Sequence, residues 1–197
     1  MDTDKYGLDK TKVKLRSEIR GVLNNLPPKK RAADSAKVRA LLPQQSFWEA
    51  AAAILLFAPL PNEVDIWPLL EEAAATERIV ALPRFNAATG KYTASHVQNP
   101  QSEIVTGRFG IREPVANCVE IPLNRFDLVL APGVAFDALG HRLGRGRGFF
   151  DRLLAEVRGV KCGVAFDEQI VNAVPAGMLD VRMNFVLTPT RCVTCDE

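Results

Sequence analysis

The chain has 197 residues, and its 25 Lys and Arg against 23 Asp and Glu give a formal net charge of +2. A chain of this length buries roughly 70% of its unfolded surface, which excludes a disulfide-stapled miniprotein, and the small net charge argues against a nucleic-acid coat. The longest apolar run, residues 50–60, is shorter than the roughly 20 residues of a membrane span. The charged residues 1–5 precede no apolar segment, which predicts a cytoplasmic protein without a secretory signal.

Two helices are predicted before the first strand. Apolar residues at helical spacing among cations indicate a helix over residues 9–25, which Pro27 and Pro28 end. An alanine-rich helix follows over about residues 28–42, where a proline in the first turn is allowed. The apolar run at 51–58 is interpreted as a buried strand, although periodicity alone does not separate strand from helix there.

The rest of the chain alternates between short apolar runs, which are typical of buried strands, and helix signals. The strand candidates are residues 78–85, 91–97, 119–123, 127–131, 161–166 and 184–188. The helix candidates are residues 63–76, capped by Asn62, residues 149–157, and a short helix over 167–172 that Asp167 caps. The first two strand candidates are expected to form a hairpin, and residues 98–117 are expected to be irregular.

Strands that alternate with helices imply βαβ units and a mainly parallel sheet covered on both faces. The predicted fold class is therefore α/β. We expect one domain over residues 1–197, with N-terminal helices at about 9–42 and an α/β core at about 50–190.

The cysteines are expected to be reduced thiols, because the chain shows no export signal. They are Cys118, Cys162, Cys192 and Cys195. The last two have the spacing of half a zinc site, but the only histidines, His96 and His141, are isolated. Ordinary thiols are therefore favoured over a metal or redox site.

The most informative stretch is residues 127–152, DLVLAPGVAFDALGHRLGRGRGFFDR, between a predicted strand and a predicted helix. In an α/β sheet this is the carboxyl edge of a strand, where ligands bind. Glycines allow a close backbone approach, guanidinium groups offer paired donors to phosphate oxygens, and the next helix adds free N–H groups. The stretch predicts an anion site and favours a polyphosphate, with a loop of solvated arginines as the alternative. It is neither a Walker A loop nor a GxGxxG motif.

The residues that form a longer pattern here are Asp127, Pro132-Gly133, Ala135-Phe136-Asp137, Gly140, Arg142-Leu143-Gly144, Gly146 and Gly148-Phe149-Phe150-Asp151-Arg152. Further segments in the same order are Lys12-x-x-Leu15-Arg16, Glu63-Val64-Asp65 and Gly110-Ile111-x-Glu113-Pro114. Together they resemble the 5-formyltetrahydrofolate cyclo-ligase family, also called methenyltetrahydrofolate synthetases, over about residues 10–190. The resemblance implies a three-layer α/β/α domain like those of sugar-phosphate isomerases and CoA transferases.

The resemblance also implies an enzyme, which uses ATP to cyclise 5-formyltetrahydrofolate to 5,10-methenyltetrahydrofolate and releases ADP and phosphate. Phosphorylation of the formyl oxygen makes it a leaving group, and N10 of the same molecule then closes the ring at high effective molarity. The expected partners are these small molecules with Mg²⁺, and neither nucleic acid nor membrane, for a monomeric chain. The alternatives are a related ATP-using enzyme with another formyl or pterin-like substrate, and a non-catalytic phosphate-ligand binding domain.

By the same resemblance, Arg145 and Arg147 are the expected catalytic residues. The expected ATP-binding residues are Lys12, Arg16, Arg142, Gly144, Arg145, Gly146, Arg147, Gly148, Phe149, Phe150 and Asp151. The expected folate-binding residues are Ala58, Glu63, Arg145, Gly146, Arg147, Gly148 and Phe149. The expected magnesium ligands are Asp151 and Asn184, and Asn184 stands where many members have an acid.

Several of these residues also have a purely structural interpretation. Lys12 and Arg16 could belong to a solvated helix face. Glu63 and Asp151 could be acids that stabilise a helix start, and Phe150 could be a core residue. The sequence leaves these alternatives open.

Overall fold

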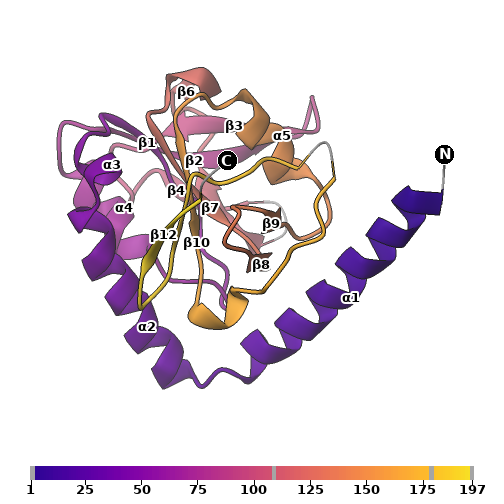
Figure 1. The fold of residues 1–197 in the computed structure, drawn as a ribbon. Coiled ribbons are helices and arrows are strands. Elements are labelled where there is room, and N and C mark those ends of the chain that lie inside the picture. The colour runs from indigo at the N-terminus through magenta and orange to yellow at the C-terminus, as the bar shows by residue number, and fades with distance from the viewer. Residues whose placement is uncertain (1–2, 108–109, 178–179, 196–197) are drawn as a thin grey trace.

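The computed structural model describes residues 3–107, 110–177 and 180–195 (Figure 1). The chain starts with two helices, α1 (Thr3–Asn25) and α2 (Pro28–Leu41), which diverge in a V from the turn between them (Figure 1). The break falls at Pro27, whose φ of −58° and ψ of 139° are extended, because a residue before a proline avoids the helical region. Both predicted helices are confirmed, and α1 begins six residues earlier than the pattern from residue 9 indicated.

One mixed sheet forms the centre of the molecule. In spatial order its eight strands are β12 (Cys192–Thr194), β11 (Phe185–Leu187), β10 (Val160–Val164), β7 (Leu128–Pro132), β1 (Ala53–Leu55), β2 (Ile79–Asn86), β3 (Lys91–His96) and β6 (Glu120–Ile121). The strands from β11 to β2 are parallel to one another. Strands β12, β3 and β6 pair antiparallel, so the predicted mainly parallel sheet is confirmed.

The remaining helices are short. They are α3 (Ser46–Glu49), α4 (Trp67–Ala74) and α5 (Phe149–Glu156), with 3-10 turns at η1 (Leu42–Gln44), η3 (Leu123–Arg125) and η4 (Asp167–Gln169). Within the described ranges, no helix combines the length and the apolar character needed to span a membrane.

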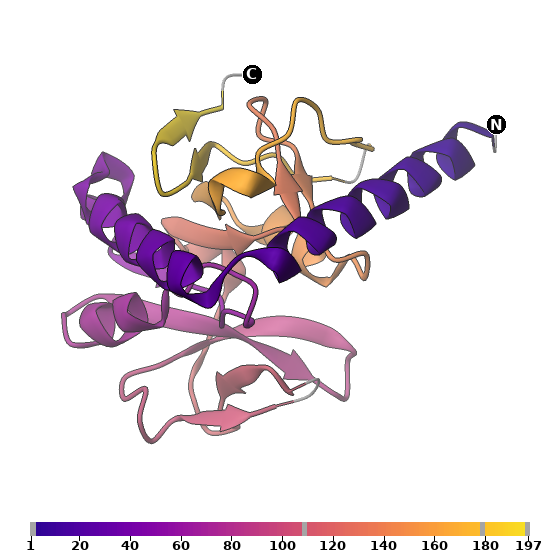
Figure 2. The same ribbon diagram turned by 90° about the horizontal axis from the view of Figure 1, so that it is seen from below.

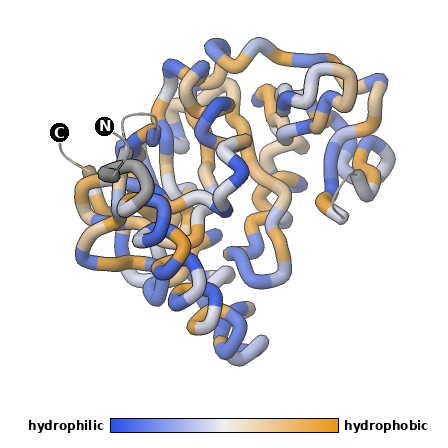
Figure 3. Tube along the Cα trace, turned by 90° about the vertical axis from the view of Figure 1, so that its right-hand side faces the viewer, coloured by the Kyte–Doolittle hydropathy of each residue, from blue (hydrophilic) through white to orange (hydrophobic). Residues whose placement is uncertain are grey.

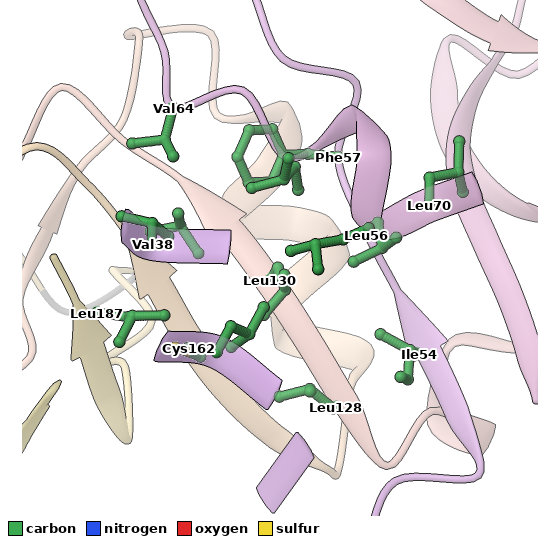
Figure 4. Close-up of a cluster of buried hydrophobic side chains, with 14 of the residues drawn as sticks. Val38, Ile54, Leu56, Phe57, Val64, Leu70, Leu128, Leu130, Cys162 and Leu187 are labelled. Carbon is green, nitrogen blue, oxygen red and sulfur yellow. The ribbon is translucent and has the colours of Figure 1, made fainter. Parts of the chain in front are cut away.

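Alternate residues of the central strands contact two different hydrophobic clusters. Ile54 and Leu130 pack with α1, α2, α3 and α4, and part of this cluster is drawn in Figure 4. Leu55 and Val129 pack with α5 on the opposite face. The central strands are apolar without alternation because both of their faces are buried. In Figure 3 the central strands carry hydrophobic colours, whereas α1 is mostly hydrophilic. Helices therefore cover both faces of the sheet, which is the expected α/β/α layering. That residues 1–197 form one domain stays a prediction.

The helix predicted from residue 63 begins only at Trp67, so that prediction is wrong at its start. Asn62 does not cap it, and residue 66 occupies the N-cap position without a side-chain cap. The Glu63 carboxylate instead accepts a hydrogen bond from the backbone N–H of Leu60 at 2.9 Å. This bond closes a turn between β1 and α4, and the turn places Glu63 beside a cavity.

Other short elements also differ from the predictions. Residues 98–117, expected to be irregular, contain a hairpin of β4 (Ile104–Thr106) and β5 (Arg112–Pro114). The glycine-rich stretch contains a second hairpin, β8 (Ala135–Phe136) with β9 (Arg142–Leu143), and β12 was not predicted at all. The helix predicted over 167–172 is only the turn η4, and Phe166, not Asp167, precedes it. These strands are two or three residues long, so their pairing depends on tertiary neighbours rather than on a local pattern.

Candidate active site

A cavity of about 490 Å³ lies at the carboxyl edge of the parallel strands. Ala58 follows β1, Pro83 belongs to β2 and Gly133 follows β7, and all three line it. Its apolar wall consists of Phe57, Leu60, Tyr92, Ile111, Phe149 and Phe150. Aromatic and aliphatic walls of this kind favour a flat, largely apolar ligand.

The glycine-arginine loop forms another wall of this cavity. Gly146 and Gly148 have φ angles of 99° and 63°, in the left-handed region that residues with a Cβ rarely adopt. Gly148 is the N-cap of α5, so the loop turns directly into the first turn of that helix. Its glycines are therefore required by the backbone, and they alternate with arginines that line the cavity.

Arg142 connects the loop to the sheet. It is only 4% exposed, its Nη1 donates to the carbonyl of Pro132 at 2.8 Å, and its Nη2 forms an ion pair with Asp151. Its guanidinium also lies 5.6 Å from the ring centre of Phe150. Arg142 thus holds the end of β7 and the start of α5 together, and Asp151 lines the cavity beside it.

Arg145 and Glu63 form an ion pair in the lining of the cavity. Arg145 Nη2 donates to Glu63 Oε1 at 2.8 Å and Nε donates to the same oxygen at 3.1 Å, while Asn62 Oδ1 accepts a further bond at 3.2 Å. The Glu63 side chain is 7% exposed and that of Arg145 is 41% exposed. One expected catalytic residue and one expected folate-binding residue are therefore in direct contact. Arg147 is exposed and also lines the cavity.

Helix α1 presents three cations to this region, four residues apart and therefore on one face. Lys12 forms an ion pair with Asp180, Arg16 Nε donates to the carbonyl of Gly144 at 2.8 Å, and Arg20 Nη2 donates to the carbonyl of Arg145 at 3.3 Å. Burial, followed by the charge of Arg20, lowers the pKa of Arg16, so an anion at this face would be favourable.

A second cavity lies between α1 and the loop. It is lined by Val13, Arg16, Ser17, Arg20, Gly21, Asn24 and Arg145. Arg20 and Arg145 line both cavities. The two compartments therefore share a wall of two guanidinium groups. Arg20 was missed by the sequence interpretation, although its position one helical turn after Arg16 was a usable signal.

The structure does not bring the two expected magnesium ligands together. Asn184 precedes β11 at the amino end of the parallel strands, where its Oδ1 accepts from the backbone N–H of Lys161 at 2.9 Å. Asp151 lies at the opposite, carboxyl edge, in the first turn of α5. The pairing of Asp151 with Asn184 is therefore corrected, because the two residues occupy opposite ends of the sheet.

Asp180 is the acid that the structure places on the cationic side instead. Burial would raise its pKa, but hydrogen bonds from Lys12 and from the backbone N–H of Gly177 outweigh it and lower the pKa. Arg142 lowers it further through its charge. In the part of the chain that the structure describes, no three His, Cys, Asp or Glu residues gather as a metal site, and Cys118, Cys162 and Cys192 are thiols outside any disulfide.

Asp137 stabilises the β8–β9 hairpin that carries Arg142. It is 2% exposed and accepts four hydrogen bonds, from the backbone N–H groups of Leu139, His141 and Val174 and from the ring Nδ1 of His141, at 2.8–3.0 Å. Burial opposes its charge, but the bonds from Val174 and His141 outweigh burial and lower its pKa. The turn therefore depends on an ionised carboxylate.

This leads to a prediction about acid stability. Because the folded pKa of Asp137 lies below the unfolded one, its contribution is present above about pH 4 and is lost as the pH falls through the folded pKa. Asp137→Asn should therefore flatten the decline of the unfolding free energy between about pH 5 and pH 2 in urea titrations. The control Glu72→Gln, at an exposed position on α4, should keep the wild-type slope. An unchanged slope in Asp137→Asn would contradict the assignment.

The comparisons with known proteins agree with one another on the family that this chain resembles. A family model described as the 5-formyltetrahydrofolate cyclo-ligase family matches residues 9–189. The 5-formyltetrahydrofolate cyclo-ligase of Escherichia coli (strain K12) is 34% identical over 145 residues, 72% of this chain and 80% of that protein. The Haemophilus influenzae cyclo-ligase is 31% identical over 88% of this chain and 95% of its own length. The structure of Aquifex aeolicus 5,10-methenyltetrahydrofolate synthetase matches with a TM-score of 0.86 and 30% identity, covering 94% of this chain and 93% of that one.

Proposed function

Because this chain belongs to the 5-formyltetrahydrofolate cyclo-ligase family and is a ligase of that kind, we propose that its two adjoining cavities hold the two substrates of that reaction. The cavity with the aromatic wall suits the flat pterin and aryl rings of 5-formyltetrahydrofolate. The cavity along α1 suits ATP, the nucleotide that this family uses.

The phosphates of ATP would lie at the wall that the two cavities share. Arg20 and Arg145 line both sides of it, and Arg16 contacts the backbone of the loop there. The first turn of α5 adds backbone N–H groups and the positive end of its dipole. The γ-phosphate would then be next to the folate, with Arg145 able to neutralise the charge that develops during its transfer.

The reaction needs positioning and charge stabilisation rather than a protein nucleophile. The formyl oxygen attacks the γ-phosphorus and ADP leaves. N10 then attacks the activated formyl carbon, its proton is released, and the C–O bond breaks to expel phosphate and leave the methenyl bridge. Glu63, which lines this cavity, would accept a hydrogen bond from the ring or amide N–H groups of the folate, and enclosure of the substrate would hold N10 near the carbon.

Two carboxylates that act on Arg16 through their charge, Asp151 and Asp180, also fit Mg²⁺. This ion is usually held by one or two carboxylates together with substrate phosphates and water. Asp151 lines the folate cavity, and Asp180 interacts with Lys12 and Arg142 on the same side. We assign these two carboxylates to the metal, which would neutralise phosphate charge when bound.

The observation that carries this proposal is the position of Arg145, which lines both cavities and is paired with Glu63. The test is to mix the purified protein with 5-formyltetrahydrofolate, ATP and Mg²⁺ and to record methenyl absorbance and phosphate release together. We expect one phosphate per methenyl group formed, and loss of turnover when a chelator removes the metal. ATP binding without turnover would contradict the folate assignment and favour a different formyl or pterin-like substrate.

The expectations of a monomeric, cytoplasmic protein without nucleic-acid or membrane partners stay predictions. None of the proposed steps depends on them.

A further inference from the structure

Arg112 lies on the wall of the folate cavity and has no assigned role. It is the first residue of β5, and its guanidinium carbon lies 3.4 Å from the ring centre of Trp67, the first residue of α4. Such stacking holds a guanidinium group in a fixed orientation while its N–H donors stay available. In the motif Gly110-Ile111-x-Glu113-Pro114, Arg112 is the variable position.

The charge of Arg112 is not balanced by an ion pair. Throughout residues 3–107, 110–177 and 180–195, no carboxylate lies within ion-pair distance of it. Asp65, a nearby acid, accepts from the backbone N–H of Trp67 at 3.0 Å and lies 3.7 Å from Arg39. Asp65 and Glu71 act on Arg112 only through their charge, and burial lowers its pKa. Arg112 is an exposed residue, and a cation that lines a cavity without an ion-pair partner favours an anionic ligand.

Arg112 lies on a different wall from the proposed phosphate site. The β4–β5 hairpin packs against β2, where Glu113 accepts from the backbone N–H of Phe85 at 3.3 Å. Figure 2 shows this hairpin on the β2 and β3 side of the molecule, away from α1. Arg142 and Arg145 belong instead to the loop after β7 and contact α5, α1 and the β1–α4 turn. The apolar residues Ile111 and Tyr92 also line the cavity on the hairpin side.

We propose that Arg112 binds a carboxylate of the glutamate tail of the folate substrate. The inference rests on the proposed function, because it takes the cavity to hold a folate. A folate carries a flat pterin, an aminobenzoyl ring and then a glutamate with free carboxylates. With the formyl end at Arg145 and the rings along the apolar wall, the carboxylates are the groups left to meet a cation on the hairpin side. A guanidinium group matches a carboxylate with two parallel N–H donors.

The experiment compares substrates with and without the glutamate, using the full-length protein. For 5-formyltetrahydrofolate, Arg112→Gln is expected to raise KM roughly 10- to 100-fold, since a charge-assisted pair is lost, with little change in kcat. For 5-formyltetrahydropteroate, which lacks the glutamate, wild type and Arg112→Gln should have the same KM. The KM for ATP should not change with either substrate, which separates tail binding from phosphate binding.

Arg78→Gln is the matched control, because Arg78 also lies over a tryptophan, 5.6 Å from the ring centre of Trp48, but lines neither cavity. It should leave both KM values at the wild-type level. A KM change in Arg112→Gln that is equal for both substrates, or is absent, would overturn the proposal. A wild type that turns over neither substrate would instead reject the proposed function. In that case a tail role is tested by binding of aminobenzoylglutamate, which Arg112→Gln should weaken if the site exists.

Discussion

Arg145→Ala is expected to lower kcat roughly 1,000-fold, the scale reported for removing a guanidinium or oxyanion donor from a transition state. Arg145 lines both cavities and pairs with Glu63, and the proposed function assigns phosphoryl transfer to this position. The measurement is steady-state kinetics with each substrate varied in turn. The KM for ATP should rise more than the KM for the folate, because the lost charge acts first on phosphate.

Two variants make this result interpretable. Arg158→Ala removes an exposed arginine two residues after the end of α5 that lines neither cavity, and it should keep wild-type kinetics. Glu63→Gln keeps the shape of Glu63 but removes the partner charge of Arg145, and it should raise the KM for the folate more than the KM for ATP. If Arg145→Ala raised only the KM for the folate and kept kcat, the loop would be wrongly assigned to the phosphates.

Arg142→Met is expected to lower the free energy of unfolding by about 3 kcal/mol, because removal of one partner leaves a partly buried carboxylate without its counter-charge. The Arg142 side chain is 2% exposed and that of Asp151 is 24% exposed, so the figure is placed at the low end of the range for buried pairs. The melting temperature should fall by roughly 6 to 12 °C for a chain of this size. Urea unfolding monitored by circular dichroism measures both the free energy and its slope.

A double-mutant cycle tests whether the loss comes from the ion pair. Asp151→Asn alone leaves Arg142 buried without a charged partner, so it should also destabilise the protein. The double variant, Arg142→Met with Asp151→Asn, should then be less destabilised than the two single effects together. Strictly additive effects would show that Arg142 acts through packing on Phe150 or its bond to Pro132. All variants that lose Asp151 should also lose activity if this carboxylate holds the metal.

The elements with strong local patterns were predictable. Neighbouring residues in the chain are enough to specify three of them. These are the cationic amphipathic helix, the apolar central strands and the glycine-arginine stretch between β7 and α5. For this reason α2, β7 and β10 lie close to their predicted ranges, while α1 begins six residues earlier than predicted and β1 covers only Ala53–Leu55 of the predicted 51–58. The short strands β4, β5 and β12 were missed, because two or three residues carry too little pattern and their partners decide whether they form.

The candidate site was predictable in its residue types but not in its contacts. Arg145 meets Glu63 across 82 residues of chain, and Lys12 meets Asp180 across 168. No local pattern indicates such pairs, since they depend on which edge of the sheet each loop reaches. Asn184 illustrates this: its spacing matched the pattern of a family ligand, but the direction of β11 puts it at the amino edge.

The amino-acid sequence by itself determined that this is an α/β protein with a glycine-arginine loop between β7 and α5, and it indicated the family to which the chain belongs. These features follow from hydrophobic periodicity, glycine conformation and charge, which act over a few residues. Only the tertiary structure decided that Arg20 and Arg145 form a wall between two cavities, that Asp180 rather than Asn184 lies on the cationic side, and that Arg112 stacks on Trp67. The physical reason is that parallel strands and crossing helices bring distant residues together, and side-chain reach then decides which of them interact.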